Sequence, residues 1–289
     1  MPNQIDVLTR INLQDMLDNF GWSSLRFGRG IVERLFWSPA RVLAHQVIDF
    51  DRRAGDIGLQ AAARELLDKY VGEVRVIGAK NVPATGGLIL ASNHPGMTDT
   101  LVCFTALPRN DLYSVSADRP FLRALPNIAQ RLFWVSDKTN ERMTVVRQVS
   151  RYVQSGGSVL ICPAGEIEPD PAVMPGAIQS LRNWSESLGL FVRLAPDSVI
   201  VPTCVSGVIF GPALDNPLTR LRKKQKDRER LAATIQAALQ SAGLIKSRMR
   251  VTVEFGKPMR AADLTGDAAS ITRAVTDAMT RIIAQLERS

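Results

Sequence analysis

The sequence predicts an α/β fold in which helices sandwich a mixed, largely parallel sheet of about seven strands. Short apolar runs bounded by glycine, proline or serine recur over residues 71–289, and longer amphipathic stretches separate them. This alternation is typical of α/β domains, because neighbouring parallel strands need a crossover connection, usually a helix. Residues 1–70 lack such strands and are expected to form an N-terminal helical region, followed by the main domain over 71–289.

Composition limits the classes of partner. The 289-residue chain is long enough for a sizeable core, and its formal net charge of +8 favours an anionic partner. Net charge alone does not choose among nucleic acid, an anionic bilayer and a phosphate-bearing molecule. No basic segment carries the interleaved aromatic rings of a single-strand binder, so we expect no nucleic-acid partner. The three cysteines lack metal-ligand spacing, which predicts core packing in a reducing compartment and no metal site.

The N-terminal region is expected to contain four helices, over Asn12–Phe20, Gly30–Trp37, Pro39–Phe50 and Gly58–Tyr70. The second and third carry apolar stripes with arginines beside them, and Ser38 is expected to cap the third, with Pro39 in its first turn. Such a pair fits a membrane-docking element at the bilayer interface, or packing on the domain's own core. The first residues carry no secretory signal, and Ser198–Leu214, the longest uncharged run, is too short and interrupted to span a bilayer, so no transmembrane segment is expected.

Seven strands and five further helices are expected after this region. The strands are Glu73–Ile77, Gly87–Ala91, Asp111–Ser116, a run within 131–138, Ser158–Cys162, Ser198–Val205 and Arg250–Phe255. The helices are one from about Thr100 to Leu107, Thr139–Ser155, one starting at residues 174–178, Leu231–Leu239 and Asp267–Arg288.

The second of these strands leads into the most informative stretch of the chain. Pro95-Gly96 forces a turn, and Thr98 or Asp99 can cap the following helix. Residues five apart on a continuous helix point about 140° away from each other. His94 and Asp99 can therefore meet only across non-helical backbone, which Pro95-Gly96 supplies. A carboxylate against an imidazole fixes its tautomer and leaves the other ring nitrogen as a general base. The residues alone fit equally a loop histidine that satisfies a turn.

Residues 93–99, Asn-His-Pro-Gly-Met-Thr-Asp, resemble the first motif, His-x-x-x-x-Asp, of the glycerolipid and lysophospholipid acyltransferase family. The resemblance implies that His94 is the general base on an acceptor hydroxyl, that Asp99 orients it, and that Asn93 lies at the substrate. It also implies transfer of a fatty acyl group from acyl-CoA or acyl carrier protein to a hydroxyl of a glycerolipid or related lipid, with neither a cofactor nor an acyl-enzyme.

Residues 131–138 resemble the family's second block, an apolar strand that usually ends in an arginine for the acceptor's phosphate. The chain has Ser136-Asp137-Lys138 at that place. Either Lys138 or Arg142 replaces the arginine, or no phosphate is bound there. Lysine lacks the bidentate geometry of arginine, so the exchange changes how a phosphate is held.

Residues 163–168, Pro-Ala-Gly-Glu-Ile-Glu, resemble the third block, commonly Phe-Pro-Glu-Gly-Thr-Arg. Pro163 and Gly165 hold their places and are expected at the substrate, whereas the block's glutamate and arginine are replaced by alanine and isoleucine. Glu166 and Glu168 are the candidates for the acceptor contact from a shifted position, with Glu166 favoured. The alternative is two solvated loop carboxylates. The replacements argue against glycerol 3-phosphate as the acceptor.

Two further stretches bear on lipid. Ser198–Val205 resembles the family's fourth block, which lines the acyl pocket, and also fits a plain core strand. Leu218–Arg230 holds seven cationic residues, which fit a polybasic strip against anionic headgroups or a solvated helix face. Together with the N-terminal helices, they predict a cytoplasmic protein in peripheral contact with the inner face of an anionic membrane.

The sequence also fits two other functions. One is a thioester or lipid hydrolase that activates water with the same base. The other is a non-catalytic lipid-surface binding protein of the same fold, which the altered third block favours. The intact pair of His94 and Asp99 argues against the second, because a decayed site needs neither residue.

Overall fold

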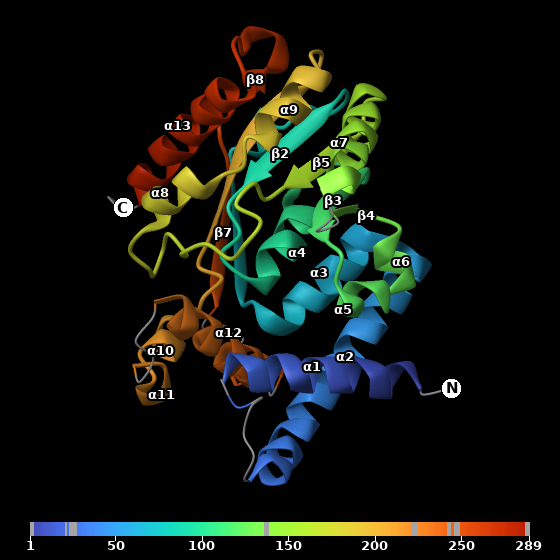
Figure 1. Cartoon of the computed structure of the whole chain (residues 1–289), viewed down its shortest axis with the longest axis vertical. Coiled ribbons are helices and arrows are strands. Elements are labelled where there is room, and N and C mark those ends of the chain that lie inside the picture. Colours follow the sequence, from blue (N-terminus) through green and yellow to red (C-terminus); the bar gives the residue numbers. More distant parts are fainter. Residues whose placement is uncertain are drawn as a thin grey trace. The chain divides into compact units, whose positions relative to one another are not determined.

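The computed structural model describes residues 3–20, 22, 28–135, 139–220, 225–241, 244–245 and 249–286 (Figure 1). The chain divides into two compact units. The first unit comprises residues 1–72, 119–130 and 209–249, and the second comprises residues 73–118, 131–208 and 250–289. Two later segments therefore join the N-terminal helices in the first unit. The domain boundary at residue 70 stays a prediction.

The second unit is built on an eight-stranded sheet. Its strands are β1 (Glu73–Ile77), β2 (Leu88–Ser92), β3 (Leu112–Ala117), β4 (Leu132–Val135), β5 (Ser158–Ile161), β6 (Val199–Ser206), β7 (Arg250–Phe255) and β8 (Met259–Arg260). The order is β1-β7-β6-β2-β5-β3-β4, and β8 pairs with β6. The run from β6 to β4 is parallel throughout, whereas β7 and β8 are antiparallel to β6. The predicted mixed, largely parallel sheet is confirmed.

The central strands are buried because helices cover them. Every residue of β2 and β5 is buried, which explains why both read as continuous apolar runs rather than alternating ones. Helix α9 (Ser187–Leu194) packs on both α7 (Thr139–Gln154) and α13 (Ala268–Leu286), while α7 packs on β4 and β5 and α13 packs on β6 (Figure 1). Side chains of β2 and of all three helices, among them Ile89, Val149, Phe191 and Val275, form one buried cluster.

The remaining elements of the second unit are short, apart from α4 (Met97–Ala106), which packs against β7. They are η1 (Ala79–Asn81), α8 (Ala177–Ser180), η2 (Leu181–Asn183) and η4 (Ala261–Asp263). Helix α7 ends where predicted, since Gly156 has a φ of +96° and its N–H, with that of Gly157, bonds back to carbonyls of the last turn.

The first unit is helical. Its helices are α1 (Gln4–Asn19), α2 (Arg29–Ile57), α3 (Leu59–Tyr70), α5 (Pro120–Arg123), α6 (Pro126–Ala129), α10 (Gly211–Leu214), α11 (Pro217–Arg220) and α12 (Gln225–Ser241). The predicted break at Ser38-Pro39 is wrong, because α2 is one helix with Pro39 inside it. Proline removes one hydrogen bond, but Ala40, Leu43 and Val47 continue a single buried face. None of the described helices combines the length and apolarity needed to cross a bilayer.

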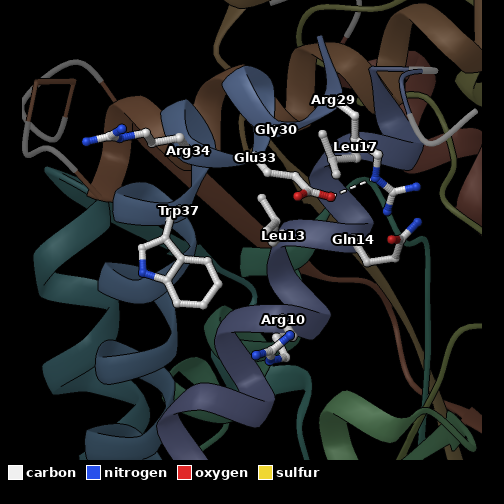
Figure 2. Close-up of a pocket in the computed structure, with 9 residues that line it drawn as sticks. All are labelled: Arg10, Leu13, Gln14, Leu17, Arg29, Gly30, Glu33, Arg34 and Trp37. Atoms are coloured by element: carbon white, nitrogen blue, oxygen red, sulfur yellow. Dashed lines mark hydrogen bonds and ion pairs between the residues drawn. The ribbon is translucent and has the colours of Figure 1, made fainter. Parts of the chain in front are cut away.

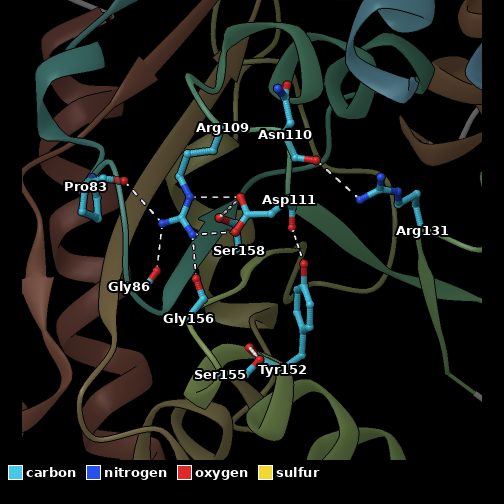
Figure 3. A network of polar contacts seen from close by, with 10 residues as sticks. All are labelled: Pro83, Gly86, Arg109, Asn110, Asp111, Arg131, Tyr152, Ser155, Gly156 and Ser158. Atoms are coloured by element: carbon cyan, nitrogen blue, oxygen red, sulfur yellow. Dashed lines mark hydrogen bonds and ion pairs between the residues drawn. The ribbon is translucent and has the colours of Figure 1, made fainter. Parts of the chain in front are cut away.

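The amino ends of three central strands are tied by one arginine (Figure 3). Arg109 is 9% exposed and donates to both carboxylate oxygens of Asp111, at 3.0 and 2.6 Å. It also donates to the carbonyls of Gly86, at 2.8 Å, and Gly156, at 2.7 Å. Asp111 accepts from the hydroxyl of Ser158 at 2.9 Å. The segments before β2, β3 and β5 are thus held together, which helps to fix the positions of β2 and β5, the two strands whose carboxyl ends lead into the candidate site.

Candidate active site

His94 and Asp99 follow the carboxyl end of β2, where open α/β sheets place ligands. Helix α4 begins at Met97, and Gly96 rather than Thr98 or Asp99 is its N-cap, so the predicted start near Thr100 is three residues late. The reason is a capping bond: Asp99 lies in the first turn, and its Oδ2 accepts from the N–H of Gly96 at 3.1 Å. The sharp turn predicted at Pro95-Gly96 lets the two side chains face each other.

The structure brings His94 and Asp99 into direct contact. The distance from Nδ1 of His94 to Oδ2 of Asp99 is 2.7 Å. The carboxylate is 2% exposed, and its Oδ1 accepts from the backbone N–H and hydroxyl of Thr100, so its orientation is determined on both sides. The imidazole is 32% exposed. With Nδ1 engaged, Nε2 is the nitrogen that can meet a substrate proton.

The charge of Asp99 raises the pKa of His94, and burial of the ring lowers it. The hydrogen bond that the ring donates to Asp99 and the charge of Glu168 raise it further, so the pKa lies above its ordinary value. The ring is therefore a stronger base than a free imidazole. This is the property that a general base needs.

Asn93 connects the end of β2 to β6. Its side-chain amide donates to the carbonyl of Val205 at 2.9 Å and accepts from the N–H of Val205 at 2.8 Å. The residue is 2% exposed. Asn93 thus holds the strand end that carries His94, and its predicted substrate contact stays a prediction.

The third-block loop follows β5, the parallel neighbour of β2. Pro163 is buried and its carbonyl accepts from the N–H of Ser185 at 3.0 Å. Gly165 has a φ of +66°, in the left-handed region that favours glycine, and its N–H closes a turn onto Cys162 at 3.1 Å. Glu166 is exposed. Substrate contacts by these residues stay predictions.

Glu168, ranked below Glu166 from the sequence, contacts His94 directly. It is 3% exposed, its Oε2 accepts from the N–H of His94 at 3.0 Å, and its own N–H donates to the carbonyl of His94 at 2.8 Å. The sequence pointed to Glu168 because alanine occupies position 164, where the family's third block has a glutamate, so that another residue has to supply the carboxylate. Nothing in the spacing distinguishes it from Glu166.

The other predicted positions contribute less. Lys138 lies outside the described residues, as do Ser136 and Asp137. The three cysteines form no disulfide, and burial raises the pKa of each thiol. A buried thiol that stays protonated is a poor nucleophile, so the cysteines do not supply a thiolate for an acyl-enzyme.

Residues 73–206, from β1 through β6, match the family model described as Acyltransferase. The fold is similar to that of the crystal structure of the 1-acyl-sn-glycerophosphate (LPA) acyltransferase PlsC from Thermotoga maritima, with a TM-score of 0.50 and 12% identity over 97% of this chain and 98% of that chain. Residues 73–206 belong to this acyltransferase family.

The matched segment of this acyltransferase contains the first-motif pair and the third-block loop. The family resemblance and the fold predicted from the sequence are therefore confirmed. At 12% identity the similarity to PlsC concerns the fold alone. No curated protein matches the sequence.

Proposed function

We propose that this acyltransferase moves a fatty acyl group from an acyl thioester, carried by coenzyme A or acyl carrier protein, to a hydroxyl of a glycerolipid or related lipid. The observation that carries the proposal is the 2.7 Å contact between His94 and Asp99, with the imidazole open to solvent and the carboxylate buried. A base held in one tautomer beside a surface opening suits proton removal from an incoming alcohol.

The reaction needs one proton acceptor and no covalent enzyme intermediate. Nε2 of His94 takes the hydroxyl proton as the acceptor oxygen attacks the thioester carbonyl. The tetrahedral intermediate then collapses, the carbon–sulfur bond breaks, and the imidazolium returns the proton to the thiolate. Asp99 stabilises the imidazolium between these steps. Backbone N–H groups of the loop after β5 are the proposed donors to the oxyanion.

The proposal is tested by release of free thiol from a panel of acyl-CoA and acyl carrier protein donors. Lysophosphatidic acid, glycerol 3-phosphate and a non-phosphorylated lipid alcohol are supplied separately as acceptors. His94→Ala is expected to abolish acceptor-dependent release. His45→Ala is the matched control, because His45 is the other histidine of the chain and is exposed on α2.

The outcomes separate the three functions. Release that needs an acceptor and is lost in His94→Ala supports the transferase, and the acceptor that responds shows whether a phosphate is required. Release without any acceptor supports a hydrolase. Silence with every donor, combined with lipid binding, supports the non-catalytic alternative that the alanine and isoleucine of the third block favour.

We also propose peripheral contact with an anionic membrane through the first turns of α2. Ile31 is 78% exposed and Leu35 is 69% exposed, and residues four apart share one helix face. Beside them is a groove of about 500 Å³ between α1 and α2, shown in Figure 2. Its lining residues are Arg10, Leu13, Gln14, Leu17, Arg29, Gly30, Glu33, Arg34 and Trp37. Of its three arginines, Arg29 pairs with Glu33 at 2.7 Å. Exposed apolar side chains next to arginines and a tryptophan suit a headgroup interface.

Cosedimentation with vesicles tests this contact. The double variant with Ile31→Glu and Leu35→Glu is expected to lose binding to anionic vesicles. Ile57→Glu, at the other end of the same helix and 41% exposed, is expected to keep it. Equal binding by both variants would refute this assignment of the docking surface.

A further inference from the structure

A buried carboxylate holds the backbone of the catalytic histidine. Glu168 and His94 bond to each other twice, once between main chains at 2.8 Å and once from the N–H of His94 to Oε2 of Glu168 at 3.0 Å. The two residues are 74 positions apart in the sequence. These two bonds therefore connect the loop after β5, which contains Glu168, directly to His94, the proposed base, which follows β2.

The second oxygen of this carboxylate, Oε1, accepts hydrogen bonds from two other side chains rather than from His94. Oε1 of Glu168 accepts from Nε1 of Trp184 at 2.9 Å and from the hydroxyl of Ser180 at 3.0 Å. Trp184 is 5% exposed and belongs to the buried cluster under the sheet. The carboxylate thus links the packed core to the backbone of His94 through the N–H groups of His94 and Trp184, while the hydroxyl of Ser180 divides its proton between Glu168 and the carbonyl of Ala177 at 2.8 Å.

The N–H groups of His94 and Trp184 can only donate, so each needs an acceptor oxygen of Glu168. Burial raises the pKa of Glu168 above its ordinary value, and the hydrogen bonds from Trp184, Ser180 and the His94 backbone offset part of that shift. Glutamine has one acceptor oxygen and would face one of the donors with its own N–H groups. Aspartate is shorter by one methylene and cannot reach both sides.

We propose that Glu168 is a positioning residue of the acyl-transfer site, which holds the backbone of His94 so that the imidazole stays aligned between Asp99 and the acceptor. The proposal rests on the proposed function. In the family's third block a glutamate stands where this chain has Ala164, and Glu168 supplies a carboxylate four residues later. Asp99 is hydrogen-bonded to the imidazole ring of His94 and Glu168 to its main chain, so both the side chain and the backbone of the proposed base are positioned.

The first test is steady-state kinetics of Glu168→Gln and Glu168→Asp. Misalignment of a base by less than 1 Å is enough to slow a reaction by about 10- to 100-fold. We expect kcat to fall by that range in both variants while KM for the acceptor changes by less than about 3-fold, because the carboxylate is 3% exposed and both of its oxygens are engaged by protein groups. Asp51→Asn is the matched control: Asp51 is also buried and also accepts a backbone N–H, that of Ile128 at 2.9 Å.

The second readout does not depend on activity. The chain has two histidines, so in a His45→Gln background the ring of His94 can be titrated alone by NMR. The charged groups facing the ring are Asp99 and Glu168. Removing the charge of Glu168 is expected to lower the pKa of His94 and to move the acid limb of the pH–rate profile in the same direction. If the wild-type protein is inactive with every donor, the proposed function fails. A lower pKa of His94 in Glu168→Gln would still show that Glu168 acts on the imidazole ring.

Thermal unfolding separates positioning from folding. If Glu168→Gln does not fold, Trp184→Phe and Ser180→Ala test the positioning role instead, because each removes one donor to Oε1 of Glu168. Each is expected to lower kcat by less than Glu168→Gln would. Unchanged kcat in folded variants, or a fall in kcat no larger than that of Asp51→Asn, would overturn the proposal. So would an unchanged titration of His94.

Discussion

Arg109 is buried and holds the segments before three strands together, so Arg109→Met is expected to lower the free energy of unfolding. Methionine keeps an apolar stem in the space of the arginine and removes the guanidinium. Four hydrogen bonds of 2.6 to 3.0 Å are lost, two to Asp111 and one each to the carbonyls of Gly86 and Gly156 (Figure 3). The side chain of Arg109 is only 6% exposed, so water does not replace these bonds freely.

The magnitude follows from those contacts. A hydrogen bond contributes a net of about 0.5–1.5 kcal/mol, and more when a charged group takes part. The carboxylate of Asp111 is 38% exposed, and water can solvate it once the arginine is gone, which reduces the loss. We expect the free energy of unfolding to fall by about 3 kcal/mol. At about 2–4 °C per kcal/mol, Tm falls by roughly 6–12 °C.

Urea and thermal unfolding followed by circular dichroism measure this loss. Arg131→Met is the control, because Arg131 lies in the same region but makes one long bond of 3.4 Å to Asn110 and a contact over the ring of Tyr113. Its loss is expected to stay within about 1 kcal/mol. If both variants lose equally little, the network does not hold the strand ends together and the reasoning is wrong.

Two further predictions concern the site. Because Asp99 raises the pKa of His94 above its ordinary 6.5, the acid limb of kcat/KM should lie above pH 6.5, and Asp99→Asn should move it to lower pH as well as slow the reaction. A limb at or below pH 6.5 in the wild type would contradict the coupling. Asn93→Ala removes both amide bonds to Val205 at a 2% exposed position, and urea unfolding should show a loss of about 2–4 kcal/mol. A loss below about 1 kcal/mol would mean that the strand ends are held without this side chain.

The amino-acid sequence by itself determined the structural features that depend on residues close together in the chain. The buried run of β2 and the turn at Pro95-Gly96 are local features, so thirteen consecutive residues were enough to predict the strand, the turn and a backbone that allows His94 to meet Asp99. The family resemblance was needed to prefer that contact to a loop histidine that only satisfies a turn. The alternation of apolar runs with amphipathic stretches likewise determined the fold class, because a continuously apolar strand must have helices packed on both faces of its sheet, and the amphipathic stretches supply those helices.

The tertiary structure decided what depends on residues far apart. Asn93 and Val205 are 112 positions apart, and the sheet order that places β2 between β5 and β6 has no local signal. The same holds for Glu168, whose spacing to Glu166 says nothing about which carboxylate is buried against His94. Pro39 shows the converse: its local tendency to end a helix is real, but the continuous buried face of α2 outweighs one lost hydrogen bond. Packing of distant faces, rather than local propensity, sets these features.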